Sequence, residues 1–313
     1  MSRFIPDDID FSAYEQETEF KAQVRKPSDF ADDLDDEFRP AGSRKRHGVM
    51  RSTKLRSAIE FRPGEVTAWA GFNGHRKSMF TGQVALDMVE QDEPVLLVSL
   101  EMLPRKTLAR MCRQALATDT PSRERRDEFM RWTDGRLWLF DHVGTLTPRR
   151  ALALCRYFAD EHKGAHVFVD SMMKVCESEE SLDEQKKLVG DLCAVAQETG
   201  LHIHLVVHAK KPGSEGESRP PSKYDIRGSS AISDQLHNIV TVWMNKAKRA
   251  EMEKPAELQD SAILAKPDHL VTIEKQRNGD FEGRFALHFD HRSLRFCDSD
   301  IEAVYPYRME PLQ

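Results

Sequence analysis

The amino-acid sequence predicts an α/β fold in which helices flank a mostly parallel central sheet and antiparallel strands follow late in the chain. Three observations support this prediction. Short apolar, β-prone segments alternate with longer segments whose apolar residues recur at helical spacing. A glycine-rich turn at residues 71–78 joins the first apolar segment to a helical one. Two late strand-like segments flank residues 277–280, a sequence typical of a hairpin turn.

The individual elements follow from these patterns. Helical periodicity covers residues 78–91, 148–162 and 182–199. Residues 211–224 are rich in Pro, Gly, Ser and Lys, which predicts a mobile loop. The predicted strands are 65–70, 95–99, 137–140, 166–170, 203–207, 238–243, 269–274 and 284–289.

The charge distribution divides the chain into an arm, one domain and a tail. The net charge is −6, and it comes from an acidic excess near the start. Residues 1–48 lack periodic apolar positions, which predicts a largely disordered arm. This arm is either a solubilising tail or a docking segment in which residues 11–20 form a short helix on a partner. Residues 49–298 are predicted to form one domain, and 299–313 a tail.

Composition narrows the protein class. Hydrophobic residues at 39% and charged residues at 31% suit a soluble domain with a real core. Neither a membrane-spanning run of about 18 apolar residues nor a signal peptide is present, so we expect a cytoplasmic protein that does not contact a membrane. The five cysteines form no CxxC pair, which favours reduced, buried thiols over a zinc site.

The glycine-rich turn has the form of a phosphate-binding loop. Free backbone N–H groups and a helix N-terminus would face phosphate oxygens there. Lys77 would place a cation at the β- and γ-phosphates, and the Ser78 hydroxyl would hold Mg²⁺. We therefore expect ATP and Mg²⁺ as cofactors. The predicted nucleotide-binding residues are Gly71, Asn73, Gly74, His75, Arg76, Lys77, Ser78 and Met79.

One residue departs from the usual loop pattern. Arg76 stands where glycine normally precedes the lysine. Glycine is favoured there because the backbone approaches the phosphates closely. Arg76 could point outward, reach the phosphates, or prevent nucleotide binding, and the sequence leaves these three outcomes open.

Two carboxylates at predicted strand ends complete a hydrolytic site. The apolar strand 166–170 ends at Asp170, which would join the Mg²⁺ shell with Ser78. The strand 95–99 is followed by Glu101, which would polarise the attacking water as a general base.

Six stretches of the sequence together resemble a known family. The stretches occur in that family's order over residues 55–297: FRPGEVTAWAGFNGHRKS, VLLVSLEM, HVFVDS, HLVVHAKKP, DIRGSSAISDQLHNIVTVW and IEKQRNGDFEG. They resemble the RecA-like helicase domain of DnaB-type replicative hexameric helicases, which include the phage primase-helicases and Twinkle. The phage-type members are the most similar, because His208 stands where bacterial members carry Gln.

The resemblance assigns further roles. It implies that His208 senses the γ-phosphate and that Arg277 is an arginine finger, assisted by Lys275. The finger would enter the pocket of a neighbouring subunit, so the resemblance implies a homo-oligomer, expected to be a hexameric ring.

The resemblance also implies a path for single-stranded DNA. A loop over 172–184, with Lys174 as its first cation, and a loop over 209–230 would face the channel of the ring. Backbone amides and cations there would follow the strand's phosphates without reading sequence. The predicted DNA-binding residues are Lys210, Lys211, Lys223, Arg227, Gly228 and Ser229.

We therefore expect an ATP-dependent, ring-forming DNA helicase that translocates on single-stranded DNA during replication in a bacterial or phage-infected cell. A primase or a loader protein is the expected protein partner. One alternative is a RecA-like recombination ATPase that binds single strands. The other is a helicase-like protein whose nucleotide binding is impaired by Arg76.

Overall fold

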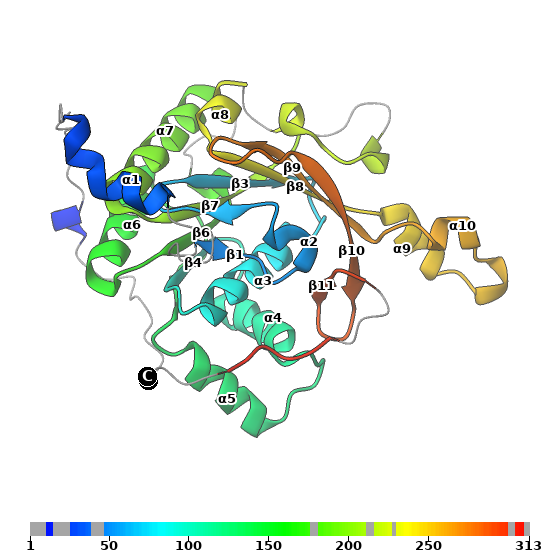
Figure 1. Ribbon diagram of the computed structural model, residues 1–313. Helices are drawn as coiled ribbons and strands as arrows, with labels where there is room; N and C mark the ends of the chain where they lie inside the picture. Colours follow the sequence, from blue (N-terminus) through cyan, green and yellow to red (C-terminus); the bar gives the residue numbers. More distant parts are fainter. Residues whose placement is uncertain are drawn as a thin grey trace.

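A nine-stranded sheet forms the centre of the molecule in the computed structural model (Figure 1). The structure describes residues 11–14, 26–38, 47–175, 181–210, 216–226, 230–299 and 304–309. The strand order is β11-β10-β9-β8-β3-β7-β6-β4-β5. A separate antiparallel pair joins β1 (Gly48–Val49) to β2 (Glu60–Phe61).

The sheet has a parallel part and an antiparallel part, as the sequence predicts. The parallel strands are β3 (Val66–Gly71), β4 (Val95–Ser99), β5 (Leu137–Leu139), β6 (His166–Asp170), β7 (His202–His208) and β8 (Asn238–Met244). The antiparallel strands are β9 (His269–Gln276), β10 (Gly283–Asp290) and β11 (Arg295–Cys297). Strand β11 was not among the strands predicted from the sequence.

Helices cover both faces of the parallel part. On one face lie α6 (Pro148–His162) and α7 (Leu182–Thr199), whose bounds match the prediction. On the other lie α3 (Lys77–Glu90), α4 (Pro104–Leu116) and α5 (Arg123–Thr133), of which only α3 was predicted. Successive residues of a strand point to opposite faces of the sheet: Ala68 and Ala70 pack in one core cluster, and Trp69 packs in the other.

The remaining helices are short or lie at the edges. They are α1 (Ala31–Phe38), α2 (Thr53–Arg56), α8 (Ser230–Gln235), α9 (Lys246–Met252) and α10 (Ser261–Leu264). The segment with α9 and α10 projects from the body beside the antiparallel strands (Figure 1). Among the described residues, every helix is too short or too polar to cross a membrane.

Part of the predicted N-terminal arm packs on the domain. Phe11 is buried, and its ring meets Tyr157 of α6 edge-on at 5.8 Å. Tyr14 donates a hydrogen bond of 2.8 Å to Glu161 of the same helix. The short helix expected over residues 11–20 on a partner is, in the described part, a single turn (Ser12–Tyr14) against this chain's own α6. Residues 15–20 lie outside the described residues.

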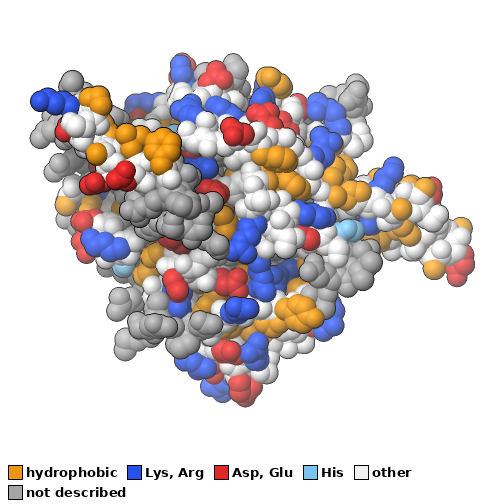
Figure 2. All heavy atoms as spheres, viewed as in Figure 1, with side chains coloured by type: hydrophobic (Ala, Val, Ile, Leu, Met, Phe, Trp, Pro, Cys, Tyr) orange, Lys and Arg blue, Asp and Glu red, His pale blue; other side chains and the backbone are white. Residues whose placement is uncertain are grey.

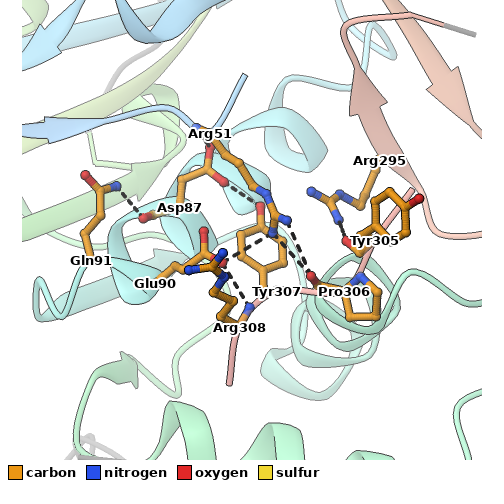
Figure 3. A network of polar contacts seen from close by, with 9 residues as sticks. All are labelled: Arg51, Asp87, Glu90, Gln91, Arg295, Tyr305, Pro306, Tyr307 and Arg308. Carbon is orange, nitrogen blue, oxygen red and sulfur yellow. Dashed lines mark hydrogen bonds and ion pairs between the residues drawn. The ribbon is translucent and has the colours of Figure 1, made fainter. Parts of the chain in front are cut away.

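Residues 304–309 pack against α3 and form hydrogen bonds with it (Figure 3). Tyr307 is buried, and its hydroxyl donates a hydrogen bond to Asp87 of α3. The same carboxylate accepts a 3.0 Å bond from the backbone N–H of Arg51. The guanidinium groups of Arg51 and Arg295 each lie 4.7 Å from the Tyr307 ring centre. Burial raises the pKa of Asp87 to about 6, because these partners offset only part of the lost hydration.

This raised pKa predicts a pH dependence of stability. The folded-state pKa of Asp87 lies above its ordinary value of 3.8. The protonated side chain therefore makes its full contribution to the stability of the fold below about pH 4. That stabilisation is lost as the pH rises through about 6. Asp87→Asn cannot titrate. The free energy of unfolding of the wild type, relative to this variant, should therefore fall by up to roughly 3 kcal/mol between pH 4 and pH 7.

Urea unfolding at each pH measures this difference. Asp119→Asn, at an exposed position beyond the end of α4, controls for the loss of one negative charge. A difference between wild type and Asp87→Asn that stays constant with pH would contradict the assignment.

Candidate nucleotide-binding site

The carboxyl ends of four parallel strands bring the predicted site residues together. In the strand register Gly71 pairs with His208, and Ser99 pairs with Asp170. Parallel strands that stop at the same level leave their following loops at one edge of the sheet, where ligands of open α/β sheets bind. Residues from β3, β4, β6 and β7, far apart in sequence, therefore meet there.

A cavity of about 720 Å³ lies at this edge. Its size falls in the range of pockets for nucleotide-sized ligands. The predicted residues that line it are Asn73, Gly74, Arg76, Lys77, Ser78, Met79, Glu101, Asp170 and His208. Seven more residues line it that the sequence analysis did not assign to nucleotide binding: Leu100, Arg110, Val143, Gly144, Met173, Lys174 and Val206.

The loop that precedes α3 needs unusual backbone conformations. Gly74 has φ +77°, in the left-handed region that glycine adopts without strain. A Cβ on Gly71 would lie 2.4 Å from the carbonyl oxygen of Val242, so only glycine fits where β3 passes β8. Gly71 itself shapes the loop rather than lining the cavity.

Lys77 is held at the base of the cavity. Its ammonium donates hydrogen bonds to the carbonyl oxygens of Gly71 at 2.9 Å and Phe72 at 3.0 Å. Its Nζ also lies 3.3 Å from Nδ1 of His208. Burial lowers the pKa of Lys77 to about 8, and Asp170 and Glu101 oppose that shift by their negative charge.

Arg76 adopts the conformation that glycine would otherwise supply. Its φ is +63°, and it stands at the N-cap position of α3 without a side-chain capping hydrogen bond. Its guanidinium stacks 3.7 Å from the ring centre of Phe289 on β10. Of the outcomes that the sequence left open, the structure therefore shows the guanidinium engaged with the antiparallel part of the sheet.

His75 was predicted to bind the nucleotide, yet its side chain faces away from the cavity. The ring is buried, accepts a 3.0 Å hydrogen bond from the backbone N–H of Met244, and lies 3.0 Å from Glu217. The physical reason is the pair of left-handed residues on either side, Gly74 and Arg76, which turns this one side chain inward.

Glu101 stands opposite the loop. Its carboxylate accepts a 2.7 Å hydrogen bond from the Ser171 hydroxyl, and its Oε1 lies 3.8 Å from Nε2 of His208. Interaction with His208, helped by the Ser171 bond, lowers the pKa of Glu101 to about 2. The carboxylate is therefore ionised at neutral pH and able to accept a hydrogen bond from water.

Ser78 and Asp170 offer oxygen ligands on the same wall. Burial raises the pKa of Asp170, and a hydrogen bond from Ser78 opposes that shift. A hydroxyl and carboxylates at one side of a polar cavity are the donor set that Mg²⁺ prefers. The residues present therefore fit this ion.

Arg277 and Lys275 lie away from the cavity of their own chain. Lys275 is among the last residues of β9 and Arg277 directly follows that strand, at the end of β9 that pairs with the start of β8, because Ile239 pairs with Lys275 and Asn238 with Gln276. Arg277 donates a 2.8 Å hydrogen bond to the carbonyl oxygen of Asp234, and Lys275 donates one of 3.0 Å to the same oxygen. Strand β8 is parallel to β3, so this is the sheet edge opposite the cavity.

The predicted DNA-binding residues are only partly described. Lys210 is exposed, and its backbone N–H donates to the carbonyl of Asp225. The Lys223 ammonium donates a 3.2 Å bond to the carbonyl oxygen of Glu274 and lies 3.9 Å from the Glu282 carboxylate. Lys211, Arg227, Gly228 and Ser229 lie outside the described residues. On the face in Figure 2, basic and acidic side chains are interspersed.

Two basic residues that line the cavity were not predicted to lie there. Arg110 comes from α4, which was not predicted, although Met111, Ala115 and Leu116 form an apolar stripe that could have revealed that helix. Lys174 was assigned to a channel loop, and the structure places it on the cavity wall beyond Asp170.

Comparisons with known proteins agree with this geometry. A family model described as an AAA domain matches residues 51–214, just over half of the chain. The structure of a DnaB-like replicative helicase, solved to show its interactions with primase, has a TM-score of 0.69 at 16% identity; the match covers 88% of this chain and 67% of that one. The ATPase domain of G40P has a TM-score of 0.63 at 16% identity, over 77% of this chain and 86% of that one.

These structural matches confirm the predicted RecA-like fold. The chain therefore belongs to the AAA domain family, and it has the fold of the ATPase domains of DnaB-type replicative helicases.

Proposed function

We propose that this protein is an ATP-dependent, ring-forming DNA helicase that translocates on single-stranded DNA in replication. The observation that carries the proposal is the cavity, in which Lys77, Ser78, Glu101, Asp170 and His208 converge at the strand ends of a DnaB-like fold. We infer from this fold that the protein forms a ring and acts on DNA. A soluble, cytoplasmic location fits it.

The cavity residues support hydrolysis of ATP. Water would attack the γ-phosphorus while the bond to the β-phosphate oxygen breaks, which gives ADP and inorganic phosphate. Glu101 would orient this water and accept its proton. Lys77 would exchange its carbonyl partners for the β- and γ-phosphate oxygens, and the ordered N–H groups at the start of α3 would bind the phosphates.

Ser78 and Asp170 would hold Mg²⁺, which supplies charge neutralisation for the phosphates when it is bound. Ser78 and Asp170 line the same cavity as Lys77, so the residues that would hold the ion lie with the lysine that would bind the phosphates. His208, 3.3 Å from the Lys77 ammonium and next to Glu101, would respond to the γ-phosphate.

The placement of Arg277 supports a ring. Because it lies at the sheet edge opposite its own cavity, it can complete a site only in another subunit. In a closed ring each subunit would present its cavity to one neighbour and Arg277, with Lys275, to the other. The finger would stabilise charge on the transferring phosphoryl group.

The DNA contacts that we propose lie on the segment that follows β7. Lys210, Lys211, Lys223, Arg227, Gly228 and Ser229 would follow the phosphates of a single strand. One of the similar structures is a helicase solved for its interactions with primase. A primase or a loader protein is therefore the protein partner that we propose.

Glu101→Gln tests the proposed function. The wild type should hydrolyse ATP faster with single-stranded DNA and should unwind a forked duplex. The variant should lose about 10²- to 10³-fold in ATP turnover, because the general base is gone, and should lose unwinding with it. It should still bind a non-hydrolysable ATP analogue within about threefold of wild type. Glu253→Gln, an exposed acid near α9, is the matched control.

A wild type that hydrolyses ATP as an assembled ring and never unwinds a fork would contradict the helicase assignment. Open filaments on single-stranded DNA, seen by electron microscopy, would favour the recombination ATPase instead.

Arg76→Gly tests whether the unusual loop binds nucleotide. Replacing Arg76 removes its cation–π contact with Phe289, which destabilises the loop by about 1 kcal/mol. Glycine also removes the left-handed backbone strain at this position, which stabilises the loop by a similar amount. The two effects nearly cancel, so the conformation of the loop should be preserved. Calorimetry should therefore show that wild type binds Mg²⁺-ATP and that the variant's Kd differs by less than about threefold. A wild type that binds nothing until Arg76 is replaced would show that the loop is impaired.

Mixed rings test the position of Arg277. Neither Lys77→Ala nor Arg277→Ala should hydrolyse ATP alone. An equal mixture should recover up to about a quarter of wild-type activity, because that share of random interfaces combines an intact cavity with an intact neighbouring Arg277. Lys77→Ala mixed with Glu101→Gln, two lesions of one cavity, should recover none. No recovery in the first mixture at any ratio would argue against a site shared between subunits.

A further inference from the structure

His75 connects the phosphate-binding loop to the segment that follows β7. Its neighbours Gly74 and Arg76 line the cavity, while its own ring is buried on the opposite side of the loop. The side chain of His75 therefore belongs to the loop and lies outside the cavity. What it contacts instead is Glu217, at the start of the segment 216–226.

The hydrogen-bond pattern fixes the protonation of this histidine. Nδ1 accepts the backbone N–H of Met244 at 3.0 Å, so the ring proton lies on Nε2. Nε2 lies 3.0 Å from a carboxylate oxygen of Glu217 and donates to it. Burial lowers the pKa of His75, which favours the neutral ring. A neutral N–H that donates to a carboxylate is a charge-assisted hydrogen bond, stronger than one between neutral groups.

Glu217 has two further partners besides His75. Lys246 of α9 forms an ion pair with its carboxylate, and the indole N–H of Trp243 donates a 2.9 Å hydrogen bond to its backbone carbonyl. Ion pairing and hydrogen bonding with Lys246, and then with His75, lower the pKa of Glu217, so the acceptor stays charged at neutral pH.

The other end of the same segment is also tied to the nucleotide site. Ile226 forms an antiparallel bridge with Ala209, the residue after His208. The backbone N–H of Ala209 donates a 2.9 Å hydrogen bond to the carbonyl of Gly71. Between its two ends the segment carries Lys223 and Tyr224, whose ring is 77% exposed. The segment is thus linked at one end to His75 and at the other, through Ala209, to Gly71, both of which belong to the glycine-rich loop.

We propose that the hydrogen bond from His75 to Glu217 makes the segment 216–226 move with the phosphate-binding loop, so that nucleotide binding and single-strand binding become coupled through it. His75 and Glu217 are positioning residues that contact neither ligand. The inference rests on the proposed function, because it takes that segment to be part of the DNA-binding surface. It assigns this chain's His75 a role distinct from that of the other loop residues.

Coupled binding measurements on the full chain test the proposal. The affinity for a fluorescent oligo-dT strand is measured without nucleotide and with a saturating Mg²⁺ complex of a non-hydrolysable ATP analogue. Wild type should show a change of about tenfold or more, and the strand should change the analogue's affinity by the same factor. Glu217→Ala should reduce that factor to less than about twofold, while each separate affinity stays within about threefold.

Two further variants isolate the hydrogen bond. Glu217→Gln keeps an oxygen that accepts from His75 and loses the charge, so its coupling should lie between that of wild type and that of Glu217→Ala. Glu253→Ala removes an exposed acid near α9, paired with Arg249, and should behave as wild type. Amide exchange of residues 216–226 gives a readout without DNA: the analogue should protect them in wild type and not in Glu217→Ala.

The outcomes separate this inference from the proposed function. Full coupling in Glu217→Ala, equal loss in Glu217→Gln and Glu217→Ala, or exchange of 216–226 that ignores the analogue in wild type would each overturn the His75–Glu217 link. A protein that binds the analogue and protects 216–226, yet binds no strand, would refute the DNA function and leave the link intact.

Discussion

The register of the parallel strands is the constraint on which the candidate site depends. Gly71 lies beside His208, and Ser99 beside Asp170, because backbone hydrogen bonds hold β3, β7, β4 and β6 at fixed offsets. A slip of one residue would send every side chain of a strand to the other face. Both faces are covered, so such a slip would also misplace residues of both cores. Packing far from the cavity thus sets the distances within it.

The parts of the fold that local patterns encode were predicted from the sequence. Strands buried on both faces appear as continuous apolar runs, and β3, β4, β6 and β7 lie within one residue of their predicted bounds. The glycine-rich loop and the acid at the end of β6 are also local signals. They located Lys77 and Asp170, which the structure brings to one cavity.

What the sequence did not provide depends on contacts between distant segments. The direction of His75 is set by left-handed backbone at Gly74 and Arg76 and by an acceptor, Glu217, more than a hundred residues away. Arg110 enters the cavity from α4, whose first half is polar and whose apolar stripe is confined to its second half, so that stripe alone does not say that Arg110 faces the cavity. The three residues of β11 are too few for periodicity to be visible.

The contact between Tyr307 and Asp87 has a consequence for how the chain is made. The two residues are 220 positions apart, and Asp87 lies in the helix that begins at the phosphate-binding loop. During synthesis the ribosome delivers residues at about 5–20 per second. Asp87 is therefore without its phenol partner for many seconds after it has been added to the chain. Nascent chains that stop short of Tyr307 would leave this helix end open to chaperones or proteases.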